Sequence, residues 1–238
     1  MHPAEASLLI AARQHARRSA AVELMEIRCT RPAESGVLWV ELHLTRLARR
    51  EAREALLWEA HDVSGRKRAH DALRHRALHD ELTGLANRDL FTDRLAHALA
   101  RTERSQGAPA VLFLDVDQFK AINDTHGHRV GDAVLAELAR RLQHVIRSSD
   151  SAARLGGDEF VVACEDLPTP QSAVEVATRL LASFGTPISV GTLDLQVRVS
   201  IGVTFSTNRA EPPDDVIARA DAAMYLAKQR GGGKVEIH

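Results

Sequence analysis

The hydrophobic pattern near the start of the chain has a period of two residues. Within residues 36–47, the apolar residues Leu38, Val40, Leu42 and Leu44 alternate with Val37, Trp39, Glu41, His43 and Thr45, of which the last three are polar. This alternation is typical of a half-buried strand. Residues 23–30 and 55–63 have similar strand character, and Pro, Gly and charged residues interrupt the pattern at 32–36 and 47–54. We expect three antiparallel strands joined by hairpin connections, which together make only a fragment of a domain.

A charged segment follows these strands. Ala69, Leu73 and Ala77 recur at helical spacing within it, so residues 66–79 are predicted to form a linker helix. The helix is shorter than the three or four heptads that identify a coiled coil, although a short dimer-forming helix remains an alternative. The predicted organisation is an N-terminal segment at 1–65, the linker helix at 66–79 and a larger domain at 80–238.

Helix and strand patterns alternate from residue 80 onward, which predicts an α+β fold with a mixed central sheet flanked by helices. The expected helices cover residues 89–104, 130–146, 171–184 and 213–229. The expected strands cover residues 110–116, 159–164, 193–205 and 234–237, with 187–190 as a candidate hairpin partner of the third.

Composition narrows the class of protein. The chain has 238 residues, of which 45% are hydrophobic and 26% charged, and 31 basic residues balance 32 acidic ones. These values are those of an ordinary globular protein, and they give no overall positive field for nucleic acid. Cys29 and Cys164 are too few for a disulfide framework, and no apolar run approaches the roughly 18 residues of a membrane helix. We therefore expect a cytoplasmic chain with no membrane span and no nucleic-acid partner.

The first chemical candidate lies at the end of the strand Leu112-Phe113-Leu114-Asp115-Val116-Asp117. A carboxylate among core residues is costly unless it is paired or holds a cation. This favours a metal-binding role for Asp115. Asp117 can equally end the strand and cap the next helix.

The second candidate is the segment Arg154-Leu155-Gly156-Gly157-Asp158-Glu159-Phe160. Two glycines between strand-like segments predict a tight hairpin whose backbone can lie close to a ligand. Asp158 and Glu159 follow that turn, and one of them can share a cation with Asp115 because adjacent strand residues point to opposite faces. On its own, the pattern Gly156-Gly157-Asp158-Glu159 could also be an ordinary exposed turn.

Taken together, these motifs resemble the GGDEF-domain diguanylate cyclases over residues 79–234. The blocks that carry the resemblance are HDELTGLANR at 79–88, LDVDQFKAINDTHGHRVGDAVL at 114–135, RLGGDEF at 154–160, VSIGVT at 199–204 and ADAAMYLAKQRGG at 220–232. The resemblance implies a nucleotide-cyclase palm-like fold. It also implies that two GTP molecules are joined into cyclic di-GMP with release of pyrophosphate, by a homodimer in which each protomer presents one GTP.

The resemblance also implies roles for individual residues. Asp115, the Val116 carbonyl and Asp158 would hold Mg²⁺, for which Mn²⁺ could substitute, and Glu159 would lie nearby. Asp115, Asp158 and Glu159 would be the catalytic residues. Asp158 is also a candidate base for the 3′-hydroxyl. The remaining substrate-binding residues would be Asn123 and Asp132 for guanine, His128 beside ribose or base, Phe119, Lys120 and Lys228 for the phosphates, and the Gly156-Gly157 backbone. The structural alternative makes Asn123 a helix terminus and Asp132 a first-turn acid.

One departure from the family pattern concerns the phosphates. The family usually has Gly-Arg-Asn after the lysine of the last helix, whereas this chain has Gly231-Gly232-Gly233. Arg230 or Lys234 could replace the missing arginine. A smaller departure is Ala86, where the family commonly has proline.

A regulatory site is implied by Arg147-Ser148-Ser149-Asp150, whose arginine lies nine positions before Gly156. This is the spacing of the family's inhibitory site for cyclic di-GMP, although Arg and Asp three residues apart can also form a surface ion pair of little energetic value. The alternative function is a catalytically silent GGDEF domain that binds GTP or cyclic di-GMP as a regulatory module.

The N-terminal segment resembles the C-terminal part of a PAS sensor domain. The resemblance rests on the strand run at 26–45 and on Asp62 and Ser64, which match the exit motif that leads to a signalling helix. The alternative is an unrelated antiparallel sheet that forms a small dimerisation module.

Overall fold

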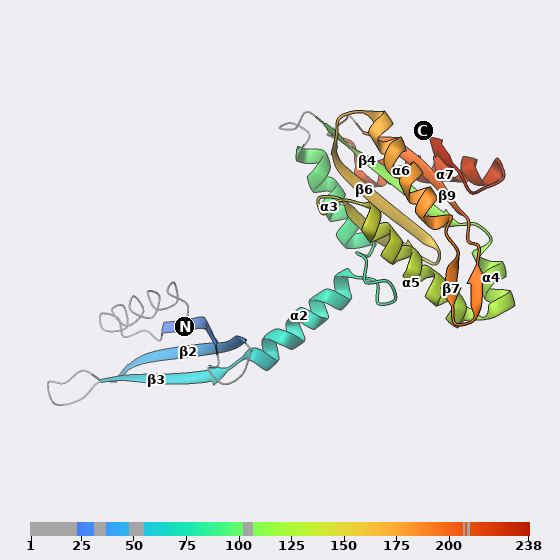
Figure 1. Cartoon of the computed structure of the whole chain (residues 1–238). Helices are drawn as coiled ribbons and strands as arrows, with labels where there is room; N and C mark the ends of the chain where they lie inside the picture. Colours follow the sequence, from blue (N-terminus) through green and yellow to red (C-terminus); the bar gives the residue numbers. More distant parts are fainter. Residues whose placement is uncertain (1–22, 31–36, 48–54, 102–106, 207, 209) are drawn as a thin grey trace. The chain divides into compact units, whose positions relative to one another are not determined.

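The computed structural model describes residues 23–30, 37–47, 55–101, 107–206, 208 and 210–238 (Figure 1). The chain divides into two compact units, Met1–His75 and Arg76–His238. The division falls inside helix α2, Ser64–Leu78, which is the helix expected over residues 66–79.

The first unit contains the predicted antiparallel sheet. Its strands are β1 (Glu23–Thr30), β2 (Val37–Leu47) and β3 (Ala55–Asp62), in the spatial order β1-β2-β3. Ile27, Leu42 and Leu44 are buried and form a small core on one face of the sheet. The predicted connection at 32–36 lies outside the described residues, as does that at 47–54 except for Leu47, which is the last residue of β2.

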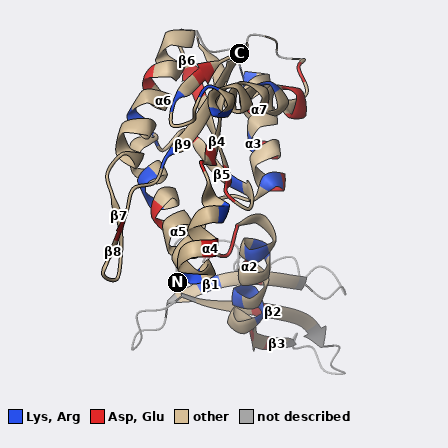
Figure 2. Cartoon of the chain, turned by 90° about the vertical axis from the view of Figure 1, so that its right-hand side faces the viewer, with Lys and Arg blue, Asp and Glu red and all other residues tan. Residues whose placement is uncertain are grey.

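The start of α2 is fixed by hydrogen bonds to the sheet. The Ser64 backbone N–H donates to Oδ1 of Asp62 at 2.9 Å, and the Ser64 hydroxyl accepts from the Trp39 N–H at 2.9 Å. Asp62 therefore marks the junction between β3 and the helix, as the sequence predicted. Basic residues occur along the length of α2 (Figure 2), and Ser64 is its only buried residue.

The second unit is built on a mixed five-stranded sheet with the order β10-β9-β4-β6-β5. Strand β4 (Ala108–Val116) lies at the centre, where it pairs antiparallel with β6 (Glu159–Leu167) and β9 (Val199–Phe205). At the edges, β5 (Ser151–Gly156) is antiparallel to β6 and β10 (Val235–Ile237) is parallel to β9. The expectation of a mixed sheet is confirmed.

Helices cover both faces of this sheet. Alternate residues of β4 point to opposite faces: Leu112 and Leu114 join the core with α5 (His128–Val145) and α6 (Pro170–Phe184). Val111 and Phe113 join the core with α3 (Arg88–Arg101) and α7 (Pro213–Gln229). Because every residue of β4 is buried, any polar side chain at its end meets the solvent only at the rim of the sheet.

The expected strand at 193–205 is wrong in one respect. Residues Leu193–Leu195 form β8, which pairs with β7 (Ile188–Val190) in a separate two-stranded sheet, and the central strand β9 begins only at Val199. Burial explains the division, because β9 is buried at almost every position whereas Leu193 and Asp194 are exposed. The helix expected at 130–146 begins two residues earlier, and the end of the helix expected at 89–104 lies outside the described residues.

Cys164 lies in β6 and is fully buried, and burial raises the pKa of its thiol to about 12. It is an inert core residue at neutral pH. Within the ranges that the structure describes, no helix has both the length and the apolar character needed to cross a membrane.

Candidate active site

Three acidic side chains gather where β4 ends and β6 begins. The register of the antiparallel pair sets Asp115 directly opposite Glu159, so both side chains lie on the same face of the sheet. Asp158 is next to Glu159, in the turn that joins β5 to β6. Sequence reasoning left open which of the two acids faces Asp115, and the strand register identifies Glu159 as its cross-strand neighbour.

Asp115 is the most enclosed of these acids, with only 7% of its surface exposed. Burial raises its pKa from 3.8 to about 6; the charges of Asp158 and Glu159 add to the rise, and the Lys228 ammonium opposes it. Nζ of Lys228, near the end of α7, lies 2.5 Å from Oδ1 of Asp115. The contact is an ion pair, and its ammonium lowers the pKa of Asp115 against the effect of burial.

The turn that carries Asp158 is held by Arg154 and Asp80. Arg154 donates to the carbonyl oxygen of Gly157 from Nε at 2.9 Å and from Nη2 at 2.7 Å. Its Nη1 lies 3.1 Å from both carboxylate oxygens of Asp80. Burial alone would raise the pKa of Asp80, but hydrogen bonds from Thr83 and the ion pair with Arg154 hold it below its ordinary value. Gly157, with φ of 52°, supplies the left-handed conformation that the turn requires.

Helix α4 (Phe119–His126) and α5 form the second part of the site. Oδ1 of Asn123 is buried and without a hydrogen-bond partner among the described residues. It packs against Gly131 of α5, where a Cβ atom would overlap it. Asp132, next in the chain, is exposed. The structure thus places Asn123 on α4 and Asp132 on the neighbouring helix α5.

The other predicted substrate residues lie around the same helices. Phe119 packs on the main core, whereas Lys120 and His128 are exposed. Oδ1 of Asp117, at the end of β4, accepts from the Ser200 hydroxyl at 2.7 Å, and Oδ2 accepts from the Gly233 N–H at 2.6 Å. Asp117 therefore connects strand ends to the glycine turn after α7 and does not act as a side-chain cap of α4.

The predicted regulatory residues form a closed turn between α5 and β5. The Asp150 carboxylate accepts from the Arg147 N–H at 2.9 Å and from the Glu165 N–H at 3.3 Å. The Arg147 side chain is exposed and lines a cavity of about 380 Å³ together with Arg94 and Gln143. Sequence reasoning missed Arg94, because only the packing of α3 against the sheet brings it near Arg147.

The match to a known family covers most of the second unit. The family model described as "Diguanylate cyclase, GGDEF domain" matches residues 77–234. The chain belongs to the GGDEF-domain diguanylate cyclase family. The GGDEF domain has the same fold in TpbB of Pseudomonas aeruginosa, with 39% identity, a TM-score of 0.64 and coverage of 67% of this chain and 93% of that one.

Two further proteins extend the comparison. The coiled coil and GGDEF domain of DgcB from Caulobacter crescentus, solved with c-di-GMP, is 32% identical with a TM-score of 0.64, covering 73% of this chain and 93% of that one. MucR of Pseudomonas aeruginosa, a bifunctional diguanylate cyclase/cyclic di-GMP phosphodiesterase, is 39% identical over 77% of this chain and 26% of its own length. The chain spans 21% to 42% of the length of three of the curated relatives that it matches.

Proposed function

We propose that this GGDEF domain is an active diguanylate cyclase that joins two GTP molecules into cyclic di-GMP and releases pyrophosphate. The observation that carries the proposal is the buried carboxylate of Asp115, which lies opposite Glu159 and near Asp158 and is paired with the Lys228 ammonium. A fold needs no such group for stability, because a buried carboxylate is costly. Relatives named as diguanylate cyclases support the same activity.

The acidic residues fit a divalent cation. Within the described part of the chain, no three or more His, Cys, Asp or Glu side chains form a ready-made metal cluster. The donors offered are instead the Asp115 carboxylate, whose Oδ1 is paired with Nζ of Lys228, and the Asp158 carboxylate, with the Val116 carbonyl and Glu159 beside them. Oxygen donors of this kind suit Mg²⁺ or Mn²⁺. When bound there, the ion would neutralise triphosphate charge and lower the barrier to 3′-hydroxyl attack.

The protein's own residues would bind and orient GTP. The amide of Asn123 and the carboxylate of Asp132 offer an acceptor and donor pattern that suits guanine. Oδ1 of Asn123 is buried against Gly131 and has no hydrogen-bond partner among the described residues, so the side chain would turn towards the base to accept from a donor there. Lys228 and Lys120 would bind phosphate oxygens, and Asp158 would accept the proton of the attacking hydroxyl.

Assembly and regulation are part of the same proposal. Each protomer would present one GTP, so the reaction requires a homodimer with two sites facing each other. Cyclic di-GMP would inhibit the enzyme at Arg147, since an arginine side chain can pair with a phosphate or with the Hoogsteen edge of guanine. Asp150 would mainly shape the turn, because its carboxylate already accepts two backbone N–H groups. The N-terminal sheet would be part of a PAS-like sensor that acts through α2.

The test is a turnover assay with GTP and Mg²⁺ over a range of protein concentrations. It compares the wild-type chain with Asp158→Ala and with Asp221→Ala, a matched control at an exposed position of α7. We expect product formation to rise faster than linearly with protein, to vanish in Asp158→Ala and to persist in Asp221→Ala. Absence of product when the chain is dimeric and GTP-bound would refute the enzyme and favour a silent nucleotide-binding module.

A further inference from the structure

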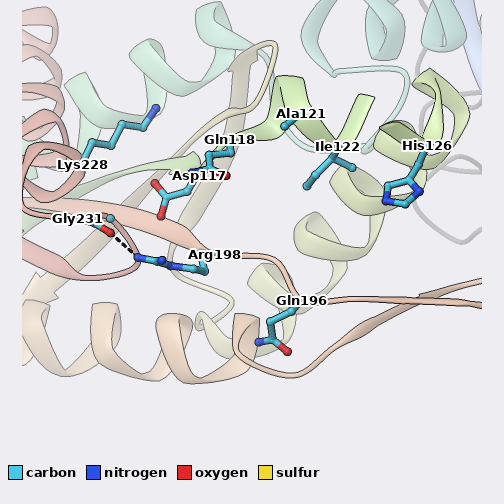
Figure 3. Close-up of a pocket in the computed structure, with 10 residues that line it drawn as sticks. Asp117, Gln118, Ala121, Ile122, His126, Gln196, Arg198, Lys228 and Gly231 are labelled. Atoms are coloured by element: carbon cyan, nitrogen blue, oxygen red, sulfur yellow. Dashed lines mark hydrogen bonds between the residues drawn. The ribbon is translucent and has the colours of Figure 1, made fainter. Parts of the chain in front are cut away.

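A cavity of about 540 Å³ adjoins the candidate active site (Figure 3). Its walls come from the start of α4, the segment that leads into β9, and the end of α7 with its glycine turn. Its charged lining residues are Lys228, Arg198 and Asp117, with His126 at the side of α4. Because Asp117 already accepts hydrogen bonds from Ser200 and Gly233, the cavity offers an anion two cations whose charge is only partly compensated.

The two cations are not equivalent. Nζ of Lys228 lies 2.5 Å from Oδ1 of Asp115, so its charge is directed towards the acids at the end of β4. Arg198 precedes β9 and is exposed. Its carbonyl oxygen accepts from the Asp117 N–H at 2.9 Å, which fixes the backbone of Arg198 beside the end of β4.

The Arg198 guanidinium is held at the cavity with donors to spare. Nη2 donates to the carbonyl oxygen of Gly231, and Figure 3 shows this bond running from the segment before β9 to the turn after α7. It is the only hydrogen bond of this side chain among the described residues. A guanidinium has five N–H donors in a planar fork that matches phosphate oxygens. Most of these donors therefore remain available to a ligand.

The glycine turn is shaped around this arginine. Gly232 and Gly233 have φ of 67° and 63°, which favours glycine at both positions. A Cβ atom at residue 233 would lie 2.7 Å from Nε of Arg198, and one at residue 232 would lie 2.5 Å from Oδ2 of Asp117. A side chain at either position would thus require Arg198 or Asp117 to move.

The cations proposed from the sequence to replace the missing arginine are placed elsewhere. Nη1 of Arg230 pairs with Oε2 of Glu236 at 2.5 Å, and Nζ of Lys234 donates to the Arg230 carbonyl oxygen at 2.6 Å. Neither residue lines the cavity. Sequence reasoning missed Arg198 because it lies more than thirty positions from Gly232, and only the pairing of β9 with β4 and β10 brings it to the turn.

We propose that Arg198 binds the terminal phosphates of the nucleotide and supplies the cation that Gly232 lacks. This inference rests on the proposed function, because it assumes that GTP binds with its reacting phosphate at Asp115 and Asp158. Lys228, which pairs with Asp115, lines the same cavity as Arg198, and the Asp117 N–H at the end of β4 donates to the Arg198 carbonyl oxygen. Phosphates that extend from the acids into this cavity would therefore reach both cations. Arg198 is a substrate-binding residue, and it takes no part in proton transfer.

The experiment measures nucleotide binding by the full chain with Mg²⁺. The probes are guanosine 5′-[α,β-methylene]triphosphate, which cannot be cleaved by nucleotidyl transfer, and GMP, which lacks the terminal phosphates. Variants are Arg198→Gln, Arg198→Thr and Arg198→Lys, with Gln196→Ala as the control because Gln196 lines the same cavity without charge. Melting temperatures of all variants separate lost binding from lost folding, and threonine suits the start of a strand.

We expect the neutral variants to weaken triphosphate binding about 10- to 100-fold, the loss of one charge-assisted contact to phosphate. GMP affinity should change less than about twofold, and lysine should restore part of the triphosphate affinity because it keeps the charge. Two results with a wild-type chain that binds the triphosphate would refute the role of Arg198 and leave the proposed function standing. One is a folded neutral variant that binds the triphosphate as well as the wild type does, and the other is a folded neutral variant that loses as much affinity for GMP as for the triphosphate. If the wild-type chain binds neither nucleotide, the proposed function fails with it.

Discussion

The ion pair between Asp80 and Arg154 links the start of the GGDEF domain to the turn that carries Asp158. We predict that Asp80→Asn breaks this pair while keeping the hydrogen bonds from Thr83, because an asparagine oxygen can still accept them. The Arg154 side chain is only 13% exposed and that of Asp80 is 23% exposed. The substitution should therefore lower the free energy of unfolding by about 1.5–3 kcal/mol, which lies between the loss expected for a surface ion pair and that for a buried one.

The assay is thermal unfolding with two probes. For a unit of this size, the predicted loss corresponds to a fall in melting temperature of about 3 to 12 °C. Both tryptophans of the chain, Trp39 and Trp58, lie in the first unit and its one tyrosine, Tyr225, lies in the second. Near-ultraviolet circular dichroism of Tyr225 should therefore report the shift, whereas tryptophan fluorescence should not.

A matched control separates the partly buried pair from an exposed one. Glu165 is also 23% exposed, but its partner Arg101 is 74% exposed, so Glu165→Gln should cost less than about 1 kcal/mol. The pH dependence gives a second check. Because the folded-state pKa of Asp80 lies below its unfolded value, its stabilisation is present above about pH 4 and is lost as the pH falls through the folded pKa. Equal effects of the two substitutions, or an Asp80 effect that persists in full below pH 3, would refute the argument.

Three further substitutions test the packing and electrostatics of the site. Because the folded-state pKa of Asp115 is raised to about 6, the free energy of unfolding should fall as the pH rises through that value. In EDTA at pH 8, the free energy of unfolding of Asp115→Asn should exceed that of the wild type by up to about 3 kcal/mol, and the two should not differ in this way at pH 3.5. Mg²⁺ should raise the melting temperature of the wild type and not that of Asp115→Asn. If Mg²⁺ raises the melting temperature of the variant and not that of the wild type, Asp115 is excluded as a ligand. Gly131→Ala should cost about 1–3 kcal/mol in urea unfolding, because its Cβ atom would overlap the movable side chain of Asn123. Gly202→Ala should cost more, about 3 kcal/mol or above, since its Cβ atom would overlap the backbone of α7; an equal or smaller loss would show that α7 can shift away from β9.

Much of the fold could be predicted from the sequence because its signals are local. The period-two pattern of β2, the apolar run of β4 and the two glycines before Asp158 each specify their own conformation within a few residues. The same local signals identified Asp115 as a costly carboxylate at the end of a buried strand. The sequence analysis predicted one strand over residues 193–205, where the structure has β8 and β9. A short exposed strand and a buried strand have the same local β pattern, and only their pairing partners distinguish them.

Tertiary structure alone decided which chemical groups meet. The register of β4 with β6 sets Glu159 opposite Asp115, and the packing of α7 brings Lys228 to the same carboxylate. The pairing of β9 with β4 and β10 carries Arg198 to the glycine turn. These contacts join residues far apart in the chain, and each depends on strand order, register and helix packing, which no single segment specifies. The sequence determined which side chains the candidate site is made of, and long-range pairing decided which of them lie next to one another.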